Sequence, residues 1–239
     1  MFRRRVLVLI GVICIFLVAL SGCGGLDFLN KTTISGQIVL NGTATNDCRM
    51  HLYANDKTYF GDVIASNGRF SHSDTGLDKE FCVQGCVIDF AFNSDAPGAC
   101  DSTMIRNYVV VKGTNNLGTI EIGSKGLSLL EPAASASPSD LPVTFSWNPY
   151  SDTSAANLSY NLVLYNVTHT PFGDWKNAVW TSLDTLGTTY ELTRAELDGN
   201  EEGVTHWSVV ASFKRNGLYY EKTLEERPIT LPAASEAGL

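Results

Sequence analysis

Residues 143–147 read Val-Thr-Phe-Ser-Trp, and this stretch decides the fold class, because large apolar side chains alternate with small polar ones. Successive side chains of a β-strand point to opposite faces, so the alternation predicts a strand with one face in a core. The same alternation recurs at residues 160–164 and 207–211. Turn residues recur about every ten positions, and no long window shows helical periodicity. We therefore predict an all-β fold, and 239 residues suffice for two tandem β-sandwich domains.

Four motifs in residues 127–232 belong together. They are Trp147, the strand Tyr160-Asn161-Leu162, the strand Thr189-Tyr190-Glu191-Leu192, and the strand Trp207-Ser208-Val209-Val210-Ala211. In this order they resemble a fibronectin type III domain, with Trp147 matching its core tryptophan. The resemblance implies a β-sandwich over residues 127–232. The tyrosine usual at the corner before the last strand is not evident, and we expect Leu197 to take its packing role.

Residues 32–123 contain a second set of motifs. They are Ile34-Ser35-Gly36-Gln37-Ile38, Ser66-Asn67-Gly68-Arg69-Phe70 and Leu117-Gly118-Thr119-Ile120-Glu121-Ile122. This set resembles the carboxypeptidase regulatory-like, or transthyretin-like, β-sandwich, which is an accessory domain in its namesake enzymes. The stretch Cys82–Cys100 departs from that family. We interpret residues 93–101 as an inserted loop held by a disulfide.

The amino terminus has a composition of its own. Three arginines at positions 3–5 precede 15 apolar residues, Val6 to Leu20, and small residues follow. The apolar run is shorter than the roughly 20 residues a membrane-spanning helix needs, which favours a cleaved export signal. Leu20-Ser21-Gly22-Cys23 resembles the lipobox of bacterial lipoproteins, which implies cleavage before Cys23 and lipidation of its sulfur. An ordinary signal peptide, or an uncleaved anchor helix, is the alternative.

The expected organisation follows from these resemblances. Residues 1–22 are the signal peptide, residues 23–31 a lipidated tether, residues 32–123 and 127–232 the two sandwiches, and residues 233–239 a disordered tail. The resemblance implies that the protein lies in the cell envelope, outside the cytoplasm, anchored by lipid to a bacterial membrane. In a bacterium with two membranes we expect the outer one: Gly24 stands where inner-membrane retention in enteric bacteria uses Asp, a rule that does not extend to other bacteria, so the membrane stays open.

Charge limits the partners. The formal net charge is -8, and removal of residues 1–22 lowers Lys+Arg from 17 to 14 against 25 Asp+Glu, which gives -11. An acidic surface repels phosphate groups, so we expect no nucleic-acid partner and no electrostatic binding to anionic headgroups. The membrane is expected as a partner only through the lipid, because two acyl chains anchor a protein stably.

The cysteines indicate an oxidising compartment. Cys14 leaves with the signal and Cys23 is the lipidation candidate, and the other four all lie in the first half: Cys48, Cys82, Cys86 and Cys100. An even number of cysteines in an exported protein predicts disulfides, with three possible pairings. A metal site is the alternative, but the spacing lacks the two matched pairs that zinc sites use.

No motif indicates catalysis. The sequence has no nucleophile elbow, no His-Glu-x-x-His and no phosphate-binding glycine loop. The four histidines, at positions 51, 72, 169 and 206, show no ligand spacing. We therefore expect no enzyme, no cofactor and no metal, and interpret the protein as a non-catalytic binding or structural module whose partner is an unknown envelope protein or glycan.

Two tryptophans support an alternative function. Trp175 follows a loop-like stretch, Pro171-Phe172-Gly173-Asp174, and Trp180 is equally hard to assign to a core face. Exposed aromatic rings can stack on ligands, so the alternative is a carbohydrate-binding surface lipoprotein with Trp175 and Trp180 as ligand contacts. Packing at the edges of the sandwich is the competing interpretation of both residues.

Overall fold

A computed structural model describes the chain over residues 32–54, 59–64, 67–73, 86–111, 113–170, 173–197 and 204–232. These segments are almost entirely β-strand, so the predicted all-β class is confirmed. Only one short helix, α3 (Arg194–Leu197), is present in these segments, and its Leu197 is fully buried, as expected. No helix of the described segments is long and apolar enough to cross a bilayer.

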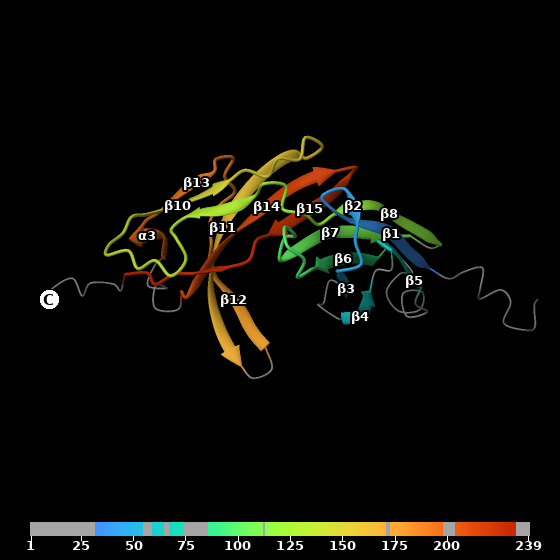
Figure 1. The fold of residues 1–239 in the computed structure, drawn as a ribbon, viewed down its shortest axis with the longest axis horizontal. Coiled ribbons are helices and arrows are strands. Elements are labelled where there is room, and N and C mark those ends of the chain that lie inside the picture. The colour runs from blue at the N-terminus through green and yellow to red at the C-terminus, as the bar shows by residue number, and fades with distance from the viewer. Residues whose placement is uncertain are drawn as a thin grey trace, which may run out of the picture.

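One large sheet runs through the molecule. It has nine strands, eight of them in the spatial order β12 (Gly173–Thr181), β11 (Ala156–Thr170), β14 (His206–Arg215), β15 (Leu218–Thr223), β7 (Ser102–Val110), β6 (Cys86–Asn93), β3 (Arg49–Ala54) and β4 (Tyr59–Ile64). The ninth, β16 (Arg227–Pro228), pairs with β14. Figure 1 shows β14, β15 and β7 in succession through the middle of the molecule.

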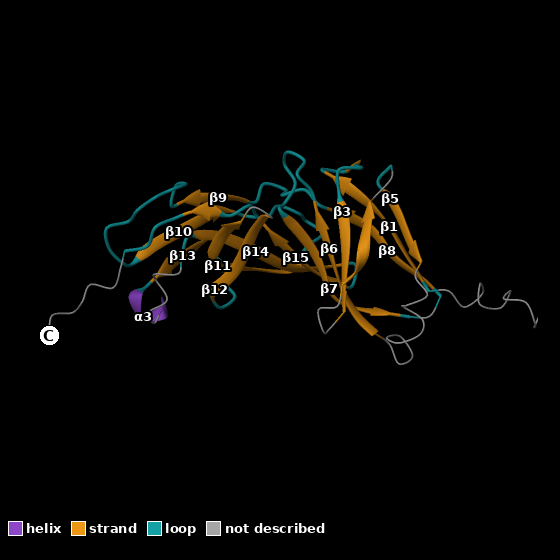
Figure 2. Cartoon of the chain, turned by 90° about the horizontal axis from the view of Figure 1, so that it is seen from below, coloured by secondary structure: helices purple, strands orange, loops and turns teal. Residues whose placement is uncertain are grey.

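Two smaller sheets complete the fold at opposite ends of the large one. A four-stranded sheet consists of β1 (Thr33–Leu40), β2 (Thr43–Ala44), β5 (Arg69–Ser73) and β8 (Thr114–Glu121), with β8 parallel to β1. A three-stranded sheet consists of β9 (Ser128–Glu131), β10 (Val143–Asn148) and β13 (Thr189–Leu192). In Figure 2 the strands β9, β10 and β13 lie at one end, and β1, β5 and β8 at the other.

Aromatic contacts join each small sheet to the large one. Phe70 of β5 meets Phe92 of β6 with ring centroids 5.9 Å apart, and Phe145 of β10 meets Trp207 of β14 edge-on at 5.0 Å. Such pairs stabilise beyond the area that they bury. The faces expected from the alternation are confirmed, because all of their residues are at most 6% exposed: Val143, Phe145, Trp147, Tyr160, Leu162, Leu164, Trp207, Val209 and Ala211.

The two halves of the chain share the large sheet because β15 pairs with β7. Five residue pairs form this antiparallel ladder, from Tyr219–Arg106 to Thr223–Ser102. Arg106 strengthens it: its Nε lies 2.6 Å from Glu221 Oε2 on β15, and its Nη1 lies 2.9 Å from Asp89 Oδ2 on β6. The two sandwiches are thus connected by backbone hydrogen bonds, an arrangement that the strand patterns did not predict.

The turns that begin this architecture follow their sequence signals. Asn41 and Gly42 have φ angles of 52° and 83° and connect β1 to β2. Asparagine and glycine both tolerate positive φ, which a two-residue hairpin turn needs. This turn matters for the site below, because it directs two backbone N–H groups toward the end of β8.

Candidate functional site

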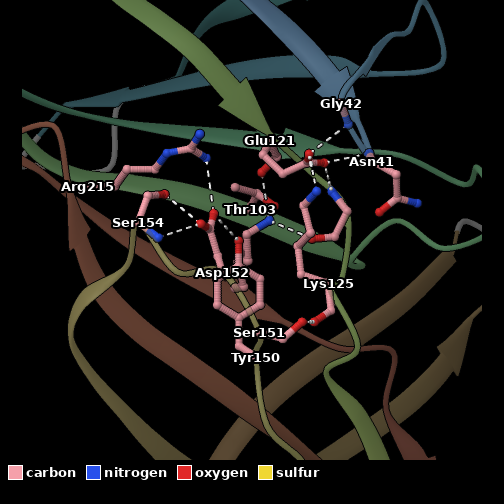
Figure 3. A network of polar contacts seen from close by, with 12 residues as sticks. Asn41, Gly42, Thr103, Glu121, Lys125, Tyr150, Ser151, Asp152, Ser154 and Arg215 are labelled. Atoms are coloured by element: carbon pink, nitrogen blue, oxygen red, sulfur yellow. Dashed lines mark hydrogen bonds and ion pairs between the residues drawn. The ribbon is translucent and has the colours of Figure 1, made fainter.

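The most elaborate group of polar side chains lies where the two halves meet. It gathers the β1–β2 turn, the end of β8, the segment 123–125, the turn 150–154 and the ends of β14 and β15 (Figure 3). In Figure 3, Glu121 with Asn41 and Gly42 forms one part of the network, and Asp152 with Arg215 and Ser154 forms the other. We call this group the junction network.

Lys222 of β15 is the central buried residue of the junction network. It is 1% exposed, and its Nζ donates to Glu121 O at 2.7 Å, Gly123 O at 3.0 Å and Thr103 Oγ1 at 3.3 Å. Three donations are what a protonated amine supplies. Burial nevertheless lowers the pKa of Lys222, with Cys100 and Glu121 acting in the opposite direction. Lys222 therefore attaches the segment after β8 to the large sheet.

Glu121, the last residue of β8, accepts hydrogen bonds from three backbone N–H groups. Its Oε1 lies 2.8 Å from both Asn41 N and Gly123 N, and its Oε2 lies 3.0 Å from Gly42 N and 3.1 Å from Lys125 Nζ. Burial acts to raise the pKa of Glu121, but these hydrogen bonds and Lys125 outweigh burial and lower it. The carboxylate is therefore ionised and fully engaged at neutral pH.

Asp152 occupies the turn after β10 and completes the junction network. Its Oδ1 accepts from Ser154 N at 2.9 Å, and its Oδ2 lies 3.3 Å from Arg215 Nη1. Burial acts to raise the pKa of Asp152, and the bonds from Ser154 together with Arg215 outweigh it and lower the pKa. This carboxylate, like Glu121, is already satisfied by protein donors.

A pocket of about 500 Å³ opens over the junction network. We call it the junction pocket; its walls come from both halves of the chain, and its lining is Gln37, Val39, Gly42, Ala44, Thr119, Glu121, Lys125, Ser151, Asp152, Thr153 and Arg215. Ligand sites occur preferentially where two domains meet. The carboxylates of Glu121 and Asp152 are both engaged by protein donors, so neither is a free general base. What the pocket offers to a ligand is therefore hydrogen-bond donors.

Three stacked aromatic rings lie beneath Lys222. Tyr150 stacks on Phe213 at 4.9 Å, Phe213 stacks on Tyr220 at 5.4 Å, and Lys222 Nζ lies 5.4 Å from the centre of the Tyr150 ring. Tyr150 and Tyr220 are each 3% exposed. Burial raises the pKa of Tyr220 to about 12 against the effect of Arg215, and burial together with Asp152 raises the pKa of Tyr150.

The raised pKa values of Tyr150 and Tyr220 lead us to expect that the folded protein loses stability at high pH. A phenol with a raised pKa in the folded state contributes stability that is present below its unfolded value near 10 and is lost as pH rises through the folded value. Between about pH 10 and about pH 12 the free energy of unfolding should fall with pH in both proteins. We expect this fall to be about 1.4 kcal/mol per pH unit smaller in the Tyr220→Phe variant than in the wild type. Urea unfolding across this range measures both slopes, and equal slopes would refute the assignment.

Two of the four cysteines do not follow the disulfide prediction. Cys48 and Cys100 are both buried, free thiols, so the predicted disulfides are wrong at these two positions. Backbone bonds close the 93–101 loop instead: Cys100 N donates to Ile122 O, and Ser124 N donates to Gly98 O. Burial raises the pKa of Cys48 to about 12 and also raises that of Cys100, which disfavours thiolate exchange. Cys82 and the side chain of Cys86 lie outside the described residues, so their pairing stays a prediction.

The two tryptophan candidates are not brought together in a described site. Trp180 is half-buried at the edge of the core, where its ring meets Tyr190 edge-on at 5.7 Å. Packing accounts for that ring. Trp175 belongs to β12, which projects from the body of the molecule in Figure 1; its backbone pairs with Thr168 of β11, and its side chain lies outside the described set.

The described residues form no metal-ligand cluster, and the expected lipid anchor lies outside them. Among the residues that the structure describes, no three His, Cys, Asp or Glu side chains gather as metal ligands. Cys23 and the rest of residues 1–31 lie outside the described residues, as does the expected tail 233–239.

Sequence reasoning missed Lys222 and Glu121. A signal for Lys222 was present, because Tyr220 and Lys222 occupy alternate positions of one strand, and a lysine on an apolar face is rare unless it is paired. Glu121 belongs to the motif at residues 117–122, but the motif by itself indicates no role for its side chain. Its importance depends on the turn at Asn41, which is 80 residues away in the chain.

Comparisons with known proteins support no assignment of a family. No protein-family model matches the sequence, and no curated protein matches it. A solved Bacteroides uniformis structure, described as a candidate carbohydrate-binding protein, is 12% identical and covers 84% of this chain and 99% of its own, with a TM-score of 0.28. A DUF3823 family protein from Parabacteroides merdae is 15% identical and covers 82% of this chain and 98% of its own, with a TM-score of 0.27. The FN1–FN3 domains of chicken CNTN1 are 9% identical; the match covers 78% of this chain and 57% of the chicken chain, with a TM-score of 0.22. At these TM-scores the similarities carry no information on ligand or partner.

Proposed function

We propose that this protein is a non-catalytic binding module of the bacterial cell envelope, held to a membrane by lipid on Cys23. The observation that carries the proposal is the stretch Leu20-Ser21-Gly22-Cys23 directly after an arginine-led apolar run of 15 residues. In this proposal residues 1–22 are removed, and residues 23–31 connect the lipid to the first sandwich.

The junction network supports a binding role rather than a catalytic one. General acid–base chemistry needs a titratable group that can reach the substrate and is not already saturated by the protein. Glu121 accepts four donors, and Asp152 pairs with Arg215 and Ser154. The junction pocket therefore suits reversible capture of a polar ligand, an envelope glycan or protein, by fixed donors.

The lipid anchor predicts an all-or-none effect of one substitution. In a bacterial host grown with labelled palmitate, the wild type should carry label and sediment with membranes, and the Cys23→Ala variant should carry none. The Cys14→Ala variant is the matched control, because it removes a cysteine from the apolar run and leaves the lipobox intact. Label on the Cys23→Ala variant, or its absence from the wild type, would refute the anchor.

A further inference from the structure

Polar side chains cover the outer face of the four-stranded sheet. Cross-strand pairing places them in two rows, Ser71–Ser35–Asn116 and Arg69–Gln37–Thr119. The next row along the sheet, Ala44–Val39–Glu121, leads into the junction network. Because side chains two residues apart on a strand share a face, the three rows form one surface.

Two hollows on this surface adjoin each other. One, of about 510 Å³, lies over the first two rows, and the junction pocket lies over the third. Gln37 and Thr119 line both of them. Together the two adjoining hollows extend from Arg69 on β5 to Arg215 on β14, and we call the pair the polar groove.

The floor of the polar groove holds side chains with unused hydrogen-bonding capacity. Within the described part of the chain, Gln37, Arg69, Ser71 and Thr119 make no side-chain hydrogen bond or ion pair. Surface side chains that face water singly are ordinary, but these four are neighbours in a concave surface. They could all contact one ligand at the same time.

The charges along the polar groove favour an anionic ligand. Three cations line it, Arg69, Lys125 and Arg215, against the two carboxylates Glu121 and Asp152. Both carboxylates are engaged by protein donors, whereas a guanidinium has five N–H donors and Arg215 uses one of its two terminal nitrogens on Asp152. Among its described residues, the groove thus offers the unpaired guanidinium of Arg69, the remaining N–H donors of Lys125 and Arg215, and no free carboxylate, in a chain of net charge -8.

The shape of the polar groove favours a glycan over a peptide. The groove lies on the face of the sheet, over the floor strand β1, which is paired on both sides with β5 and β8, whereas an added peptide strand binds at a sheet edge. The large apolar lining residues give no side-chain pocket, because Val39 is 8% exposed and Phe70 is 5% exposed. The lining has no exposed aromatic ring on which a neutral sugar could stack, so affinity has to come from charge-assisted hydrogen bonds.

We propose that the polar groove binds a linear acidic glycan. Uronate carboxylates are bound by Arg69 at one end and by Lys125 and Arg215 at the other, and sugar hydroxyls bond to Gln37, Ser71 and Thr119 between them. This inference rests on the proposed binding function and assigns the ligand to this groove instead of to Trp175 and Trp180.

Calorimetric titration of the full-length protein in detergent with oligogalacturonate tests the proposal. At about 0.15 M salt the Debye length is about 8 Å, so the distant acidic surface is screened and contacts in the groove dominate. We expect saturable binding, weakened about tenfold or more by Arg69→Gln, since one bidentate charge-assisted contact is lost. Arg49→Gln, which removes an exposed arginine on the large sheet, should leave the affinity unchanged.

Three outcomes would overturn the proposal: no binding of oligogalacturonate, equal weakening by Arg69→Gln and Arg49→Gln, or equal binding of polyglutamate or of a neutral dextran oligomer. Equal thermal unfolding of both variants excludes misfolding as the cause of any loss. The palmitate experiment is independent of this titration. A labelled protein that binds no glycan refutes only the groove, and an unlabelled protein that binds refutes only the anchor.

Discussion

Replacing Lys222 with methionine is expected to lower the free energy of unfolding by about 3 kcal/mol. Methionine fills a similar volume but cannot donate a hydrogen bond, so the carbonyls of Glu121 and Gly123 lose the donors at 2.7 and 3.0 Å. An unsatisfied buried acceptor costs about 1–3 kcal/mol, and relief of the desolvated amine offsets part of the total.

Urea unfolding at neutral pH measures this effect. Lys214→Met is the matched control, because Lys214 is exposed on the neighbouring strand β14, and its change should stay within about 0.5 kcal/mol. If Lys222→Met is as stable as the wild type, burial of the amine costs as much as its hydrogen bonds contribute. In that case Lys222 would not hold the two halves together.

Replacing Glu121 with glutamine is expected to cost about 2 kcal/mol at neutral pH. The carboxylate accepts from three backbone N–H groups, at 2.8 Å from Asn41 and Gly123 and 3.0 Å from Gly42. A glutamine amide offers one oxygen, and its NH₂ group would face at least one of these donors. The turn at Asn41 and the segment after β8 should both loosen.

The pH dependence of this effect tests whether the negative charge of Glu121 causes the loss of stability in Glu121→Gln. Because the pKa of Glu121 is lowered in the folded state, its contribution is present above the unfolded value near 4.3 and is lost as pH falls through the folded value. The difference in unfolding free energy between wild type and Glu121→Gln should therefore shrink as pH falls below about 4. Glu191→Gln, at an exposed position of β13, is the control. A difference that stays constant with pH would contradict the role of the carboxylate.

Local patterns predicted the faces of single strands, because periodicity depends only on neighbouring residues. Phe145, Trp147 and Trp207 are buried as their alternation indicates. The pairing of β15 with β7 joins residues more than 100 positions apart, for example Glu221 with Met104. No local pattern encodes such a pairing, so the shared sheet and the junction network could not be predicted from it.

The disulfide prediction failed at Cys48 and Cys100 for a physical reason. An even number of cysteines indicates pairing only when the thiols can meet, and residue counts contain no geometry. Cys48 packs into the apolar core, while Cys100 lies beside Lys222 at the junction, where the backbone already holds the loop. Trp180 shows the same limit, because its ring packs against Tyr190 from another sheet.

The most direct test of the account is the intact mass of the chain purified from the membranes of a bacterial host. We predict a protein that begins at Cys23, lacks residues 1–22 and carries the added mass of a diacylglyceryl group, with or without a third acyl chain. A chain that retains Met1, or that begins at an unmodified residue, would contradict the central claim that this protein is a lipid-anchored envelope module.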